Sequence, residues 1–93
     1  MTVGESNVDA FPFRGNKSSE DNCKLLLFPC PTYPMITIYM VIRKFGTGIS
    51  IMMEGWKWNR YAAYSDAEER LRAWGYVRTE GNPYAEEEGG NPV

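Results

Sequence analysis

The sequence predicts an α+β fold, in which a small antiparallel sheet of three to four strands carries one helix on one face. Three observations predict it: a β-rich run that reverses at a glycine, a helix start signal followed by an apolar stripe, and polar ends on both sides. The chain has 93 residues, enough for a single domain with one modest core. We divide it into a flexible segment (residues 1–22), an α+β domain (23–79) and a disordered acidic tail (80–93).

The first expected strand is a short apolar run at residues 24–28, typical of a strand that is buried on both faces. Three prolines follow within residues 29–34. Because proline lacks the backbone donor that a sheet needs, we expect a stiff connector there.

A β-hairpin is the central prediction. Gly46-Thr47 suits a two-residue turn of type II′, in which glycine occupies the first position. The register that follows opposes Phe45 and Gly48, Ile42 and Ile51, Met40 and Met53, and Ile38 and Gly55. One face of the hairpin is then apolar and is the expected core: Ile36, Ile38, Met40, Ile42, Ile51 and Met53.

A helix is predicted after the hairpin. Ser65-Asp66-Ala67-Glu68 has the pattern of a capping box at its start. Ala67, Leu71 and Trp74 follow at helical spacing and form an apolar stripe, which we expect to cover the core face of the sheet. Gly75 suits a left-handed cap at the helix end, and residues 76–79 could add a last strand.

The opposite face of the predicted hairpin is the candidate binding surface, because it is aromatic and basic. The side chains expected to contact a partner are Tyr39, Arg43, Met52, Trp56, Lys57, Trp58 and Arg60. Tryptophan, tyrosine and arginine contribute most of the binding energy in many protein interfaces. A structural alternative stays open: a β-bulge at Gly55, or cover from the N-terminal segment, would make both tryptophans part of the core.

The composition argues against catalysis. Histidine is absent, which excludes Ser-His-Asp triads and histidine-containing metal sites, and two cysteines cannot supply four zinc ligands. We therefore expect no catalytic residue, no metal, no cofactor and no enzymatic activity. The first 22 residues lack the apolar core of a signal peptide, and the longest apolar run is too short to span a bilayer. A cytoplasmic location with free thiols and no membrane contact is the expectation.

Small size, an absence of catalytic residues and a sequence without family motifs resemble the small inhibitors that phages and mobile elements make against host defence proteins. The resemblance implies a protein-binding module that inhibits a host protein complex, of which a nucleoprotein complex is one example, and a homodimer through the same face is another version. The hairpin-then-helix order also resembles small β-sheet nucleic-acid modules. In that alternative, Trp56 and Trp58 stack on bases of a single strand while Lys57 and Arg60 contact phosphates. Residues 24–79 carry eight basic and four acidic side chains, a net charge of +4.

Overall fold

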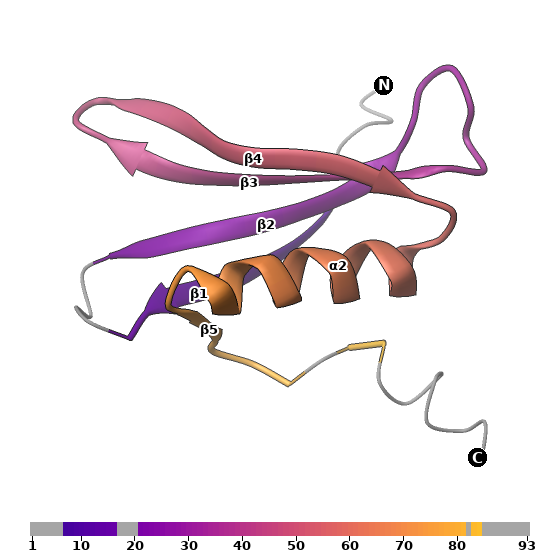
Figure 1. Ribbon diagram of the computed structural model, residues 1–93. Coiled ribbons are helices and arrows are strands. Elements are labelled where there is room, and N and C mark those ends of the chain that lie inside the picture. The colour runs from indigo at the N-terminus through magenta and orange to yellow at the C-terminus, as the bar shows by residue number, and fades with distance from the viewer. Residues whose placement is uncertain (1–6, 17–20, 82, 85–93) are drawn as a thin grey trace, which may run out of the picture.

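The computed structural model describes residues 7–16, 21–81 and 83–84, which form a five-stranded antiparallel sheet with one helix on one side (Figure 1). The elements are β1 Asp9–Gly15, β2 Asn22–Pro29, β3 Thr37–Phe45, β4 Gly48–Lys57, α2 Arg60–Ala73 and β5 Tyr76–Arg78. The strand order is β4-β3-β2-β1-β5, so α2 carries the chain from one edge of the sheet to the other. Most of the predicted disordered tail, 80–93, lies outside the described residues.

The predicted α+β class is confirmed, but the predicted number of strands is wrong. The additional strand is β1, which lies within the segment (1–22) that we expected to be flexible. Phe13 lies opposite Cys23 of β2 and is buried, while β5 pairs along the other side of β1. The sequence did not predict this strand because Pro12 lies within it, and proline inside a short run argues against strand pairing.

The helix begins earlier than predicted. Asn59 is its N-cap, and the side-chain oxygen of Asn59 accepts a hydrogen bond from the Ala62 amide (2.7 Å). The predicted start at Ser65 is therefore wrong, because a cap one and a half turns upstream lets Ala63 and Tyr64 bury as well. The predicted end is close: the helix stops at Ala73, and Gly75 has a φ of 92°.

The hairpin turn forms as predicted. Gly46 has a φ of 64°, and Phe45 lies opposite Gly48. Ile42 also lies opposite Ile51, but the register then shifts. Val41 faces Met53, which leaves Met52 as the extra residue of a β-bulge. The predicted pairs beyond this point are therefore wrong, and the observed ones are Met40 with Glu54 and Ile38 with Trp56.

The helix covers the face of β3 that we expected to be exposed. Its contacts include Tyr39 and Val41, which lie beside Leu27 and Leu25 of β2 in one buried layer. Of the predicted core residues of the hairpin, only Met53 is buried; Ile51 is exposed, and the rest are half-buried. Both faces of β3 are apolar, so the residue pattern alone did not decide which one the helix covers.

The residues that α2 contributes to the core also differ in part from the predicted ones. Ala67 and Leu71 are fully buried, as their spacing predicted, and they are joined by Ala63 and Tyr64. Trp74 was expected to complete this stripe, but 52 % of its surface is exposed. The end of the helix explains the difference, because α2 stops at Ala73 and Trp74 is the C-cap residue with a non-helical backbone.

Candidate interaction surface

The face of the sheet opposite α2 is the candidate site, and we call it the outer face. Cross-strand pairing assigns its members, because side chains directly opposite each other share a face. They are Ala10, Pro12 and Arg14 of β1, Lys24, Leu26 and Phe28 of β2, Ile38, Met40, Ile42 and Lys44 of β3, and Ile49, Ile51, Glu54 and Trp56 of β4. Figure 1 shows α2 on the other side of these strands.

The centre of the outer face is apolar. Three rows cross β2, β3 and β4. The first joins Phe28, Ile38 and Trp56; the second joins Leu26 and Met40 and ends at Glu54; the third joins Ile42 and Ile51 and begins at Lys24. Half or more of the surface of Trp56 (50 %) and Ile51 (54 %) is exposed. By contrast, Leu25, the chain neighbour of Leu26, is completely buried on the helix side. Sheets with one solvated face usually alternate apolar and polar residues, and these strands do not.

One end of the outer face is basic and hollow. Lys24 lies opposite Ile42, and Lys44 lies opposite Ile49. These four residues and Asn22 border a hollow of about 450 Å³, which Cys23 and Arg43 border from the helix side of the sheet. Arg14 lies on the same face, opposite Asn22 in the pairing of β1 with β2. The outer face therefore joins an aliphatic and aromatic centre to a positively charged end.

The two predicted tryptophans remain at the surface. Trp56 lies at the edge of the outer face, and Trp58 follows β4 with 66 % of its surface exposed. Their rings contact edge to face, with centroids 4.9 Å apart. The bulge occurs at Met52 rather than at Gly55, and it does not bring either indole into the core. Met52 itself is half-buried and packs against the core, so it contributes little accessible surface.

Tyr39 and Lys57 lie on the helix side of the sheet, contrary to the prediction. Only 2 % of Tyr39 is exposed, and its hydroxyl donates a hydrogen bond to Oδ2 of Asp66 (2.6 Å). Burial, together with this hydrogen bond, raises the pKa of Tyr39 to about 12. Lys57 Nζ lies 3.9 Å from Oδ1 of the same Asp66. Neither side chain shares a surface with Trp56: the reversed alternation of β3 turns Tyr39 towards the helix, and Lys57 is the strand neighbour of Trp56 and so points to the opposite face.

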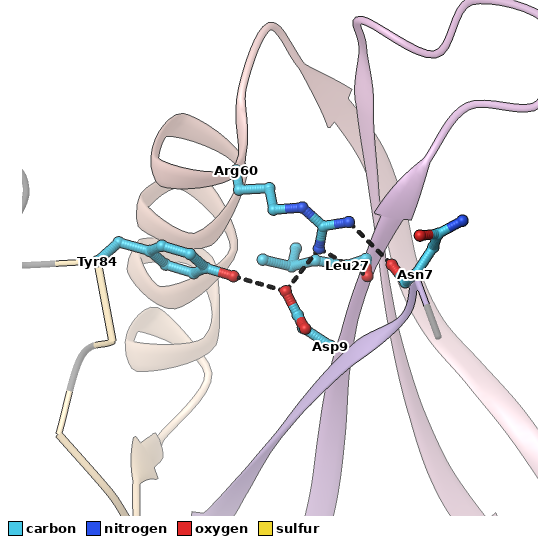
Figure 2. A network of polar contacts seen from close by, with 5 residues as sticks. All are labelled: Asn7, Asp9, Leu27, Arg60 and Tyr84. Atoms are coloured by element: carbon cyan, nitrogen blue, oxygen red, sulfur yellow. Dashed lines mark hydrogen bonds and ion pairs between the residues drawn. The ribbon is translucent and has the colours of Figure 1, made fainter. Parts of the chain in front are cut away.

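The two predicted arginines are already paired. Arg43 contacts Oδ1 of Asp21 at 3.2 Å on the helix side of the sheet. Arg60 and Tyr84 converge on Asp9 (Figure 2). Arg60 Nη1 donates to Oδ2 of Asp9 (2.6 Å), and the Tyr84 hydroxyl donates to the same oxygen (3.0 Å).

Arg60 also ties the ends of three segments together. Its Nη1 donates to the Leu27 carbonyl (3.2 Å), and its Nη2 donates to the Asn7 carbonyl (2.8 Å), as Figure 2 shows. With its bond to Asp9, this guanidinium makes three such contacts, which hold the start of α2 to β1 and β2. Arg60 therefore has a structural role and is not oriented towards the outer face.

The sequence did not assign the apolar residues at the centre of the outer face, or the lysines of the hollow, to the binding surface. They are Leu26, Phe28, Ile38, Met40 and Ile42, with Lys24 and Lys44. The signal was present in the unbroken apolar runs of β2 and β3, which are typical of strands with cover on both faces. Within the part of the chain that the structure describes, only the helix side of these strands is covered.

The described residues contain no group of three or more histidine, cysteine or acidic side chains that could hold a metal ion. The two cysteines are free, and burial, followed by the nearby Asp21 carboxylate, raises the pKa of the Cys23 thiol to about 11. A thiol with this pKa is a poor nucleophile at neutral pH. Over the described ranges, no helix has the length and apolar character needed to cross a membrane.

Comparison with known proteins adds no relative: no family model, no curated protein and no solved structure matches this chain. The geometry of the outer face is therefore the basis for a functional proposal.

Proposed function

We propose that the chain is a non-enzymatic protein-binding module that contacts its partner through the outer face. One observation carries the proposal: α2 covers one face of the sheet, while the other face presents apolar side chains without cover from the described residues. Exposed apolar patches of this kind mark interaction sites in small proteins. Trp56, with Trp58 at its edge, supplies the aromatic anchors that dominate many interfaces.

The energy available on this face is adequate for a specific complex. Complete burial of a large apolar side chain contributes about 1.5–3 kcal/mol, and the large apolar residues of the outer face are half-buried or exposed. Each side chain therefore retains about 1 kcal/mol for a partner. Six or more such residues would offset much of the cost of association, which is about 4–15 kcal/mol.

The concrete version of the proposal is an inhibitor of the kind that phages and mobile elements make, acting on a host protein complex in the cytoplasm. Its support is a site that offers broad apolar contact area, while the described residues hold no group of three or more histidine, cysteine or acidic side chains that could bind a metal ion. Such an inhibitor acts by occupying a surface, and a broad apolar sheet face is suited to that task.

Single-stranded nucleic acid is the second candidate. The residues that the sequence predicted for nucleic-acid binding do not come together, because Lys57 and Arg60 are paired with carboxylates away from Trp56. A different observation favours it: Lys24 and Lys44 share the outer face with Phe28 and Trp56. Rings and cations on one sheet face are what base stacking and phosphate contact require.

A matched pair of tryptophan variants tests the protein-binding proposal. Trp56 is 50 % exposed on the outer face, and Trp74 is 52 % exposed at the end of the helix. We expect Trp56→Ser to remove capture of a host protein from bacterial lysate and Trp74→Ser to leave the capture intact. Equal capture by both variants would contradict the proposal. Titration of labelled oligothymidylate at two salt concentrations tests the second candidate, since phosphate contacts weaken steeply with salt.

A further inference from the structure

The basic side chains of the two faces differ in how they are paired. Every ion pair among the described residues involves the helix or the helix side of the sheet. The pairs are Arg43 with Asp21, Lys57 and Arg70 with Asp66, Arg60 with Asp9, and Arg78 with Glu68. On the outer face, Arg14, Lys24 and Lys44 have no carboxylate within ion-pairing distance in the described part of the chain. Among the described residues of the sheet, the cations on the helix side are thus paired, and those on the outer face are left available.

Lys24 and Lys44 are also placed close together. Lys24 lies opposite Ile42, and Lys44 is two residues further along β3 on the same face, so the lysines are diagonal neighbours. Like charges at neighbouring positions of a sheet repel each other. Both lysines line the 450 Å³ hollow, where an anionic group would meet both of them. The only outer-face carboxylate among the described residues, Glu54, lies in the next row, opposite Met40.

We infer that the outer face binds an acidic protein surface, with an apolar strip against the aliphatic centre and carboxylates in the Lys24/Lys44 hollow. The inference rests on the proposed function and specifies the partner of that same site. Charge complementarity supports it, since the described residues of the outer face include three cations without an ion pair and one carboxylate. A partner of this chemistry would relieve the repulsion between the two lysines while it covers the apolar rows.

Two other occupants fit the face less well. Nucleic acid would need flat rings, whereas most of the central side chains, such as Leu26, Ile38 and Ile42, are aliphatic and give no stacking platform. A second copy of the chain would bring three more cations and one more carboxylate to the same interface, which increases its positive charge. Both occupants become outcomes of the test.

The test is selection of binders from a displayed library of random peptides with the purified protein as bait. We expect the enriched peptides to combine aliphatic residues with aspartate and glutamate, and their binding to weaken as salt is raised. Lys24→Glu with Lys44→Glu should reduce their affinity about tenfold, since close charge pairs contribute strongly to such interfaces. Arg72→Glu is the matched control, because Arg72 is exposed on the helix without an ion pair in the described residues. Its effect should stay within about twofold.

The outcomes distinguish failure of the inferred acidic partner from failure of protein binding through the outer face. Enriched peptides that lose binding with Ile51→Lys but show no acidic bias would overturn the inference and leave protein binding through this face intact. Peptides whose binding is unchanged by Ile51→Lys would overturn both the inference and the proposed binding through the outer face. Oligothymidylate binding that depends on Lys24 and Lys44 would replace the inference with nucleic-acid binding. A dimer in analytical ultracentrifugation that Ile51→Lys dissociates would replace it with self-association.

Discussion

The two faces of the sheet are made by the same strands, yet different interactions complete them. On the helix side, Leu25 and Val41 are fully buried, and Tyr39 is fixed by a hydrogen bond to Asp66. On the outer face, Leu26 and Met40 are of similar apolar character but only half-buried. The helix side therefore supplies the stability of the fold, and the outer face retains apolar area that the fold itself does not use.

The difference indicates that stability and binding can be changed separately in this chain. Residues next to each other in one strand point to opposite faces, so neighbouring substitutions should act on different properties. A substitution on the helix side should lower the free energy of unfolding, and one on the outer face should lower affinity. Each prediction below compares a pair of positions that differ mainly in this respect.

The largest expected effect comes from adjacent leucines of β2. Leu25→Ala should lower the free energy of unfolding by about 3 kcal/mol, because the side chain is completely buried and its removal leaves a cavity. Leu26→Ala, on the outer face, should cost about 1 kcal/mol. Urea denaturation followed by tryptophan fluorescence measures both values. Equal losses at the two positions would show that the outer face is as tightly packed as the core.

Two glycines of β4 provide the next comparison. A Cβ atom at Gly55 would lie 2.6 Å from the Tyr39 hydroxyl, which passes over this glycine towards Asp66. Gly55→Ala should therefore cost about 1–3 kcal/mol through overpacking. Gly48→Ala is the control, since the nearest atom to its Cβ, the Phe45 carbonyl oxygen, is 3.8 Å away. Thermal unfolding should leave Gly48→Ala near the wild-type midpoint; a similar drop for both variants would refute the close contact at Tyr39.

The Tyr39 hydroxyl gives a smaller and pH-dependent effect. Tyr39→Phe should cost about 1 kcal/mol at neutral pH, because a largely buried hydrogen bond is lost. The pKa of Tyr39 is raised from 10 to about 12 in the folded chain, so its contribution is full below pH 10 and is lost as the pH rises to 12. Denaturation at a series of alkaline pH values should therefore show a shallower decline for Tyr39→Phe than for the wild-type chain.

Tyr84→Phe is the matched comparison, because the pKa of Tyr84 is also raised to about 12 by burial and by its hydrogen bond to Asp9. Tyr84 is only half-buried, so its substitution should cost less at neutral pH than that of Tyr39. A larger loss for Tyr84→Phe would mean that the network around Asp9 and Arg60 stabilises the fold more than the contact beneath the helix does.

Local signals predicted the local features of the fold. The glycine-led turn set Phe45 opposite Gly48 and Ile42 opposite Ile51, and Gly75 marked the end of the helix. The side of the sheet that the helix covers was not predictable in this way, because β3 is apolar on both faces and the choice depends on pairing with β2. The bulge at Met52 has no sequence signal of its own, since no glycine or break in the apolar pattern marks it.

At the candidate site, two errors in the predicted hairpin compensate each other at Trp56. The alternation of β3 is opposite to the predicted one, and the bulge then shifts β4 by one residue relative to it. Trp56 therefore faces away from the helix, as expected, but it lies opposite Ile38 and does not share a face with Tyr39. Lys57 and Arg60 could not be excluded from sequence, because their ion pairs with Asp66 and Asp9 depend on how α2 packs on the sheet.

The smallest expected effect on stability is the one that most directly separates the two faces. Trp56→Ser and Trp74→Ser should each change the free energy of unfolding by about 1 kcal/mol or less, because both side chains are half exposed. The edge-to-face contact of Trp56 with Trp58 adds little, since Trp58 is itself mostly exposed. The two variants should therefore unfold at similar temperatures in differential scanning calorimetry. A marked destabilisation by Trp56→Ser alone would mean that the indole serves the fold, and any loss of binding in that variant could no longer be assigned to the outer face.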